Sequence, residues 1–351
     1  MQRDPLAGKL PVTLVTGFLG SGKTTMIRQL LLHPDMNRVA VVINEIGEIG
    51  IDNDLVTMSS ENVSLLANGC LCCSVRTDLQ ETLRELFGQR RAGQIADFDR
   101  VVIETTGLAD PAPVLQTLNS DTMLSAQYRL DGVVTLVDAV NGLGQLDSQP
   151  EAHKQVVLAD RIFLTKTDLA SEAQIRELTD ALHTLNPKAG IRKVLMGNVD
   201  PSELVGLGLV SARAGKNTLQ FLGELPRDAA AGVEDATYLG AHLPARHDPR
   251  IQTVSLRFSE PFTWEGFSAA LEMVITLRGP DLLRVKGIVN VEGKPVVVQG
   301  VQHIMHPPVT LDRWPSEDTG SRLVFITRGI PEPAIRGLFD AVRAMHAPAV
   351  L

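Results

Sequence analysis

Residues 17–25 read Gly-Phe-Leu-Gly-Ser-Gly-Lys-Thr-Thr, which matches the phosphate-binding pattern G-x-x-x-x-G-K-[ST]. The pattern follows an apolar run and precedes a segment expected to be helical from Thr24 on, as the motif requires. Glycines let the backbone point its N–H groups at phosphates, Lys23 would neutralise the β- and γ-phosphates, and the Thr24 hydroxyl would ligate Mg²⁺. An ordinary glycine-rich turn explains neither the lysine nor the flanking elements. The expected nucleotide-binding residues are Gly17, Phe18, Leu19, Gly20, Ser21, Gly22, Lys23, Thr24 and Thr25.

A second phosphate-side element is Glu-Thr-Thr-Gly at 104–107, which closes the apolar run 101–103. In a parallel α/β sheet this strand end is expected beside the phosphate loop. We therefore expect Glu104 to hold Mg²⁺ through water and the Gly107 N–H to contact the γ-phosphate. Lys23 and Glu104 are the candidate catalytic residues. Asp138 is a rival for the magnesium role, although a structural cap of its own strand end is the favoured interpretation.

Base recognition is predicted from Thr165-Lys166-Thr167-Asp168, directly after another apolar run. This stretch resembles the [N/T]-K-x-D signature of guanine-nucleotide binding. The Asp168 carboxylate would accept hydrogen bonds from guanine N1–H and the 2-amino group, donors that adenine lacks. The stem of Lys166 would lie along the base, and Thr165 replaces the commoner Asn. The alternative is a simple helix cap, which the preceding phosphate motif disfavours.

The rest of the first two hundred residues predicts a doubly wound, mostly parallel α/β domain over about 8–222. Short β-branched runs alternate with amphipathic segments, and the runs lack polar alternation, as expected for strands buried on both faces. A capping box, Ser171 with Gln174, marks one helix start. The predicted strands are Val12–Thr16, Val39–Ile43, Arg100–Ile103, Gly132–Val137, Arg161–Leu164 and Ile191–Leu195.

A linker and a second, smaller domain are predicted after residue 222. Residues 223–250 combine Pro, Gly and an Ala run, a composition typical of linkers. Residues 251–346 then follow the order β-α-β-β-β-α, which predicts a small α+β domain with both helices on one face of an antiparallel sheet. A hairpin turn is expected at 292–294.

The three cysteines, Cys70, Cys72 and Cys73, are the second unusual feature. Within four positions they cannot join distant segments, so thiol ligands are favoured over disulfides. Sulfur ligands favour Zn²⁺, Cu⁺ or, less selectively, Co²⁺. We expect Cys73 at the start of a helix, where the dipole would favour its thiolate. Small buried apolar residues are the alternative interpretation.

The cysteines lie in the chain between two segments expected to order around the γ-phosphate, 44–52 and 104–107. A metal held between such segments can be bound in one nucleotide state and released in the other. Glu45 or Glu48 would supply an extra oxygen ligand or orient the attacking water. For each of them a solvated loop carboxylate is an equal alternative.

Composition narrows the function classes. The 351 residues include 33 Lys+Arg and 41 Asp+Glu, and the net charge of −8 disfavours a nucleic-acid or anionic-membrane partner. No apolar run approaches the roughly 20 residues of a membrane helix, and the N-terminus lacks a secretory pattern. We therefore expect a globular, cytoplasmic protein.

Taken together, these motifs resemble the CobW/YjiA-type GTPases, relatives of the metallochaperones UreG and HypB. The resemblance covers nearly the whole chain, including a CobW-type C-terminal domain. The matching stretches are GFLGSGKTT (17–25), INEIGEIGID (43–52), NGCLCC (68–73), ETTGLADPAP (104–113), TKTD (165–168), LLRVKGIV (282–289) and RLVFITRG (322–329).

The resemblance implies a GTP-hydrolysing metallochaperone that binds Zn²⁺ or a similar ion and delivers it to a client metalloprotein. It places the metal at Cys70, Cys72 and Cys73, with Glu48 as an additional ligand. Ile43 stands where some members carry a glutamate ligand. The His-rich run of proposed storage members is replaced here by isolated histidines at 242, 247, 303 and 306, which we expect to be exposed surface residues.

We therefore expect the reaction GTP + H₂O → GDP + Pᵢ, with slow intrinsic turnover that gates delivery of zinc. Three alternatives stay open: cobalt insertion during cobalamin synthesis, a GTP-regulated zinc buffer without a client, and an ATP-dependent small-molecule kinase. The expected partner is a client metalloprotein, and a second copy of the chain, in a homodimer, is an open alternative.

Overall fold

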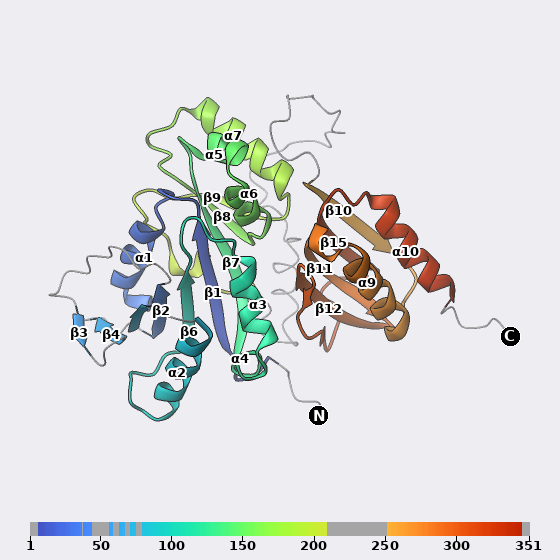
Figure 1. Cartoon of the computed structure of the whole chain (residues 1–351), viewed down its shortest axis with the longest axis horizontal. Helices are drawn as coiled ribbons and strands as arrows, with labels where there is room; N and C mark the ends of the chain where they lie inside the picture. The colour runs from blue at the N-terminus through green and yellow to red at the C-terminus, as the bar shows by residue number, and fades with distance from the viewer. Residues whose placement is uncertain are drawn as a thin grey trace.

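The computed structural model describes residues 6–36, 38–43, 56–58, 63–66, 71–74, 79–208 and 251–345, with only the backbone path of the short segments between 56 and 74. These residues form two sheets, one N-terminal and one C-terminal (Figure 1). The predicted linker 223–250 lies outside the described residues. Among the helices that are described, none is long and apolar enough to cross a membrane.

The N-terminal sheet confirms the doubly wound, mostly parallel class. Its nine described strands have the order β3-β4-β5-β2-β6-β1-β7-β8-β9. The seven strands from β5 to β9 along this order run parallel, and β3 and β4 extend the sheet as antiparallel neighbours. The strands are β1 (Leu10–Gly17), β2 (Val39–Ile43), β3 (Val56–Met58), β4 (Val63–Leu66), β5 (Leu71–Ser74), β6 (Arg100–Glu104), β7 (Tyr128–Asp138), β8 (Arg161–Thr165) and β9 (Gly190–Lys193).

Helices cover both faces of this sheet. Apolar side chains of α2 to α7 pack on one face, and those of α1 and residues 199–207 pack on the other. The predicted capping box of Ser171 and Gln174 begins α7. The helices are α1 (Lys23–Leu32), α2 (Leu79–Arg91), α3 (Ala112–Ser120), α4 (Thr122–Gln127), α5 (Gly142–Ser148), α6 (Pro150–Val157) and α7 (Glu172–Leu185), with 3-10 turns η1 (Pro34–Met36) and η3 (Pro201–Glu203).

The C-terminal unit has the predicted β-α-β-β-β-α order, with two added short strands. Its sheet is antiparallel, in the order β10-β15-β11-β12-β13, and β14 pairs with β12. Helices α9 and α10 cover one face, where Phe339 contacts four other phenylalanine rings. The elements are β10 (Ile251–Phe258), α9 (Trp264–Arg278), η4 (Gly279–Asp281), β11 (Leu282–Val291), β12 (Lys294–Val301), β13 (Ile304–Met305), β14 (Val309–Thr310), β15 (Ser321–Arg328) and α10 (Glu332–Met345).

Several strand ends differ from the sequence prediction. β7 begins at Tyr128 rather than Gly132, and Asp131 within it is accommodated because it is paired with Arg100 at 2.5 Å and accepts the Gly206 N–H. β9 ends at Lys193, since Met196 and Gly197 turn the chain with positive φ. The antiparallel extension by β3 and β4 was absent from the prediction, because strands of three and four residues are too short to show a periodic pattern.

A buried ion cluster joins the two units. The second face of the C-terminal sheet lies against the N-terminal unit, and there Asp160 accepts hydrogen bonds from Arg284 Nη2 (2.7 Å), Lys286 Nζ (2.6 Å) and the Val133 N–H (2.9 Å). Burial raises the pKa of Asp160, but Arg284 and Lys286 more than offset this, so its pKa lies well below the ordinary 3.8. Burial lowers the pKa of Lys286 to about 8, although Asp160 opposes that shift.

Further contacts surround this cluster. Val157 of α6 packs with Leu283 and Ile326 of the C-terminal sheet. Asn119 of α3 contacts His306 at 2.9 Å. His306 is only 9% exposed, so its sequence-based assignment as a surface histidine was wrong, whereas His303 is exposed as expected. Burial and the charge of Arg284 lower the pKa of His306 to about 4.

Replacing Asp160 tests this cluster. We expect Asp160→Asn to reduce the free energy of unfolding by about 3–5 kcal/mol, because two buried cations lose their counter-charge. An Asp with a depressed folded-state pKa stabilises the fold fully above its unfolded-state pKa, and this contribution declines as the pH falls from that value toward the folded-state pKa. Denaturant unfolding near pH 7 and below pH 4 should therefore show a difference between wild type and variant that shrinks with acidification.

The matched control is Glu332→Gln, since Glu332 forms an exposed ion pair with Arg336 at 2.9 Å. Exposed pairs contribute roughly 0–1 kcal/mol, so this variant should stay close to wild type. Equal losses for both variants would contradict the role assigned to Asp160.

Candidate nucleotide-binding site

The phosphate motif forms the loop between β1 and α1. Gly20 and Gly22 have φ of 74° and 91°, a conformation that glycine adopts without strain. A Cβ on Gly17 would lie 2.4 Å from the Leu136 carbonyl oxygen, so this position also needs glycine. Lys23 is 6% exposed, and its Nζ donates to the carbonyls of Gly17 (2.9 Å) and Phe18 (3.4 Å). The loop is thus wrapped around the ammonium group of its own lysine.

Thr165 connects the expected base-binding stretch to this loop. It ends β8, and its hydroxyl donates to the Ser21 carbonyl oxygen at 2.8 Å in a buried contact. Its side chain also lies nearest to the position where a Cβ on Gly22 would stand. The sequence interpretation treated threonine here as a weaker match than asparagine, but its hydroxyl ties the two loops together.

Lys166 and Asp168, the next charged residues of this stretch, lie in different environments. Lys166 has φ of 55°, and its Nζ contacts Asp138 at 2.7 Å. Asp138 is fully buried and also accepts the N–H groups of Val140 and Asn141, so it caps the end of its strand as favoured. Burial raises the pKa of Asp138, but the hydrogen bonds from Lys166, Asn141 and Val140 lower it by more, so its pKa lies below the ordinary 3.8. Asp168 is exposed, with no hydrogen bond or ion pair to the part of the chain that the structure describes.

The two expected magnesium ligands lie together. Thr24 Oγ1 is 3.4 Å from Glu104 Oε1, and Glu104 is fully buried at the end of β6, the neighbour of β1. A hydroxyl and a carboxylate at the edge of a phosphate loop are the hard oxygen ligands that Mg²⁺ prefers, so this pair fits the ion.

The loop between β6 and α3, residues 105–111, packs directly on the phosphate loop. The Thr105 N–H donates to the Val15 carbonyl at 3.0 Å, and the Ala109 N–H closes a turn on the Thr106 carbonyl at 3.1 Å. A Cβ on Gly107 would lie 2.8 Å from the Leu19 backbone nitrogen. Only glycine therefore permits this contact between the two loops.

Sequence reasoning missed a second glycine behind the phosphate loop. Gly197, with φ of 75°, follows β9, and a Cβ there would lie 2.9 Å from the backbone of Thr25 and Met26. Its neighbour Met196 is 78% exposed. In the sequence, the Met-Gly pair that follows the last predicted strand of this domain could have indicated a tight turn here.

The expected zinc ligands lie mostly outside the described residues. Cys70 and Glu48 fall there, and of Cys72 and Cys73 only the backbone in β5 is described. Cys73 lies in this strand, whereas α2 begins at Leu79, so the expectation of a helix start at Cys73 was wrong. Among the residues with described side chains, no group of three or more His, Cys, Asp or Glu could hold a metal.

Backbone register nevertheless locates the cysteine strand. β5 runs parallel to β2, which pairs with β6 on its other side. Cys73 pairs with Val42, which pairs with Ile103, the residue before Glu104. Since neighbouring strands lie about 4.8 Å apart, the backbone of Cys73 is roughly 10 Å from that of Ile103.

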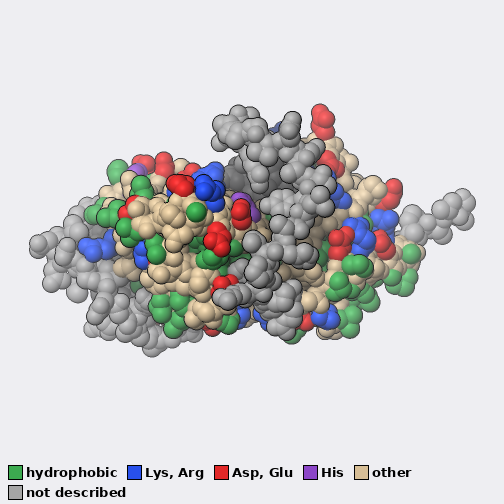
Figure 2. Space-filling model, turned by 90° about the horizontal axis from the view of Figure 1, so that it is seen from above, with side chains coloured by type: hydrophobic (Ala, Val, Ile, Leu, Met, Phe, Trp, Pro, Cys, Tyr) green, Lys and Arg blue, Asp and Glu red, His purple; other side chains and the backbone are tan. Residues whose placement is uncertain are grey.

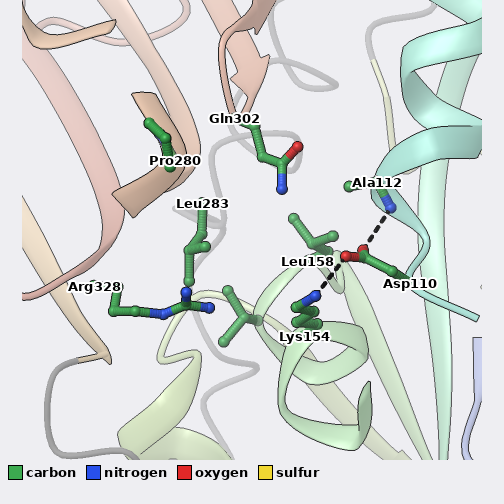
Figure 3. Close-up of a pocket in the computed structure, with 9 residues that line it drawn as sticks. Asp110, Ala112, Lys154, Leu158, Pro280, Leu283, Gln302 and Arg328 are labelled. Carbon is green, nitrogen blue, oxygen red and sulfur yellow. Dashed lines mark hydrogen bonds and ion pairs between the residues drawn. The ribbon is translucent and has the colours of Figure 1, made fainter. Parts of the chain in front are cut away.

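A cleft lies between the two units (Figure 3). It encloses about 410 Å³, part of it open to solvent. Lys154 points toward Asp110 on one wall, and Leu283, Pro280 and Arg328 come from the C-terminal unit. From above, acidic and basic side chains are interspersed over the described surface (Figure 2).

Two family profiles match the chain: the CobW/HypB/UreG nucleotide-binding domain at residues 11–193 and the cobalamin synthesis protein CobW C-terminal domain at residues 251–343. The chain belongs to the CobW/HypB/UreG family. It is a P-loop GTPase with a CobW-type C-terminal domain, as the resemblance predicted.

Relatives match over nearly the full length of this CobW-family GTPase. The zinc chaperone YjiA of Escherichia coli is 36% identical, covering 95% of this chain and 99% of YjiA. The zinc-regulated GTPase metalloprotein activator 1 of Schizosaccharomyces pombe is 31% identical over 87% of this chain and 78% of its own. The crystal structure of Zn(II)-bound YjiA GTPase from E. coli superposes with a TM-score of 0.72, at 34% identity, covering 95% of this chain and 99% of that one.

Thr165 provides the test of the loop contact. We expect Thr165→Val to weaken GDP and GTP-analogue binding about tenfold each, because the buried Ser21 carbonyl loses its donor. Thr165→Ser keeps the hydroxyl and should bind almost as wild type. Fluorescent nucleotide titration measures both variants, and unchanged affinity in Thr165→Val would contradict the assigned role.

Proposed function

We propose that this protein is a GTP-hydrolysing metallochaperone that binds Zn²⁺ at its Cys-x-Cys-Cys motif and couples the nucleotide state to transfer of zinc to a client protein. The observation that carries the proposal is the register: the cysteine strand is separated by one strand from the strand that ends in Glu104. The full-length similarity to proteins described as zinc chaperones supports the choice of metal.

In this proposal the phosphate loop supplies most of the chemistry. Phosphate oxygens replace the loop carbonyls as acceptors for Lys23, and the loop N–H groups surround them. Thr24, and Glu104 through water, would hold Mg²⁺, which would supply positive charge against the phosphates. Gly107 contacts the γ-phosphate through its N–H. Without an assigned base, intrinsic turnover is slow, and Glu45 and Glu48 stay candidates for orienting the water.

Zinc is the cargo of the cycle rather than a resident cofactor. Cys70, Cys72 and Cys73 supply three thiolates, and Glu48 is the proposed fourth ligand, because Ile43 offers none. Three thiolates with one weaker ligand leave an exchangeable position, which suits transfer better than permanent storage.

Alternative functions differ in measurable ways. A zinc buffer would show no client-dependent rise in the GTP hydrolysis rate and no transfer of metal to any client. Cobalt insertion would require tighter coupling of the nucleotide state to Co²⁺ than to Zn²⁺. A small-molecule kinase would bind ATP better than GTP.

Asp168 tests guanine recognition. We expect Asp168→Asn to reduce kcat/KM for GTP about a hundredfold, because two charge-assisted hydrogen bonds are lost. The same variant should hydrolyse xanthosine triphosphate, whose 2-carbonyl accepts a hydrogen bond from the new amide. The exposed Asp180→Asn is the control. Unchanged GTP preference in Asp168→Asn would contradict guanine recognition by this residue.

Nucleotide coupling is tested by titrating Zn²⁺ into the full chain with GDP and with a non-hydrolysable GTP analogue. We expect the zinc dissociation constants to differ by about tenfold or more, within the usual range of coupling between two sites. Lys23→Ala, which should not bind nucleotide, should show one affinity in both conditions. Equal zinc affinities in the wild-type protein would refute the coupling.

A further inference from the structure

Gln155 of α6 reaches the loop between β6 and α3 from the protein interior. Its Nε2 donates to the Gly107 carbonyl and to the Ala109 carbonyl, both at 3.1 Å. The residue is 1% exposed. Its own backbone carbonyl accepts the Thr135 hydroxyl at 2.7 Å, which fixes this turn of α6 on β7. The amide is therefore held in place before any ligand arrives.

These two hydrogen bonds define the conformation of the loop. The turn from Thr106 to Ala109 brings the carbonyl groups of Gly107 and Ala109 close together. The two N–H donors of the Gln155 side-chain amide satisfy both carbonyls. The preceding residue, Lys154, holds Asp110 at 2.8 Å (Figure 3). Consecutive residues of α6 thus hold the loop at three positions.

The C-terminal end of α6, directly after Gln155, is anchored on the C-terminal unit. Val157 packs with Leu283 and Ile326, and the Leu158 carbonyl accepts a hydrogen bond from Arg284. The helix that carries Gln155 is therefore fixed on two sides. A side chain on such a rigid support holds its partner more accurately than one on a loop.

We propose that Gln155 is a positioning residue for GTP hydrolysis: it holds the turn that follows Gly107 so that the Gly107 N–H faces the γ-phosphate. The inference rests on the proposed contact between Gly107 and the γ-phosphate. GDP lacks that phosphate, so the role of Gln155 is confined to the triphosphate state and to the hydrolytic step.

The test replaces Gln155 with Met, which keeps the length but has no donor, and with Glu, which places acceptor oxygens against two carbonyls. We expect each variant to bind a non-hydrolysable GTP analogue about tenfold more weakly and to lower kcat about tenfold or more, while GDP affinity stays within about twofold. In Gln155→Glu the rate relative to wild type should rise as the pH falls, because the protonated acid donates one hydrogen bond.

Asn186→Leu is the matched control. Asn186 is another buried amide that donates to carbonyls at the end of α6, at Val156 (2.9 Å) and Ala159 (2.9 Å), but it makes no contact with the loop 105–111. We expect this variant to lower the melting temperature and to leave the ratio of GTP-analogue to GDP affinity unchanged.

Two results would overturn the proposal: a wild-type affinity ratio and kcat in Gln155→Met, or equal losses for GDP and the GTP analogue. If Gln155→Met does not fold, Gln155→Glu and its pH profile decide. Failure of the proposed function has a different signature: wild-type protein would then bind zinc equally with GDP and with the GTP analogue, while Gln155→Met would still separate the two nucleotides.

Discussion

The constraint that organises this protein is the burial of a parallel sheet on both faces. Strands covered on both sides have no room for functional side chains along their length, so polar residues gather where the strands end. Parallel strands end at the same edge. The phosphate loop after β1 therefore meets the last residues of three strands, Glu104 of β6, Asp138 of β7 and Thr165 of β8, although these lie far apart in the sequence. β5 extends this edge to the cysteines.

At that edge of the sheet, close contacts between backbone segments determine where a side chain larger than glycine can fit. Gly107 lies against the backbone of Leu19, and Gly197 lies against the start of α1. These approaches leave no space for a Cβ, so the loops around the phosphate site are packed on one another rather than suspended in solvent. The hydroxyl of Thr165 and the amide of Gln155 then hold two of these loops from opposite sides. Such packing prepares a site for a ligand before binding, which reduces the ordering cost of binding.

The sequence was most informative where a local pattern has a single structural solution. The phosphate motif, the strand runs and the capping box at Ser171 each specify their geometry within a few residues. It was least informative where the decisive partner is distant. No local sequence pattern around Asp160 predicts that it pairs with Arg284 and Lys286, which lie 124 and 126 residues away. Gln155 looks like any helix residue until the loop at 107–109 is placed beside it. Cys73 was assigned to a helix start because local rules could not reveal that β5 adds to β2.

The ion cluster around Asp160 has a consequence for how this chain can change over time. Domain shuffling works when each module carries a self-sufficient surface, but here one face of the C-terminal module supplies two cations that pair with a buried carboxylate of the N-terminal module. A C-terminal module from another protein would lack this charge complementarity with the N-terminal module unless residues 160, 284 and 286 were inherited together. The two modules are therefore expected to be inherited as one unit, since each holds part of a single charged cluster.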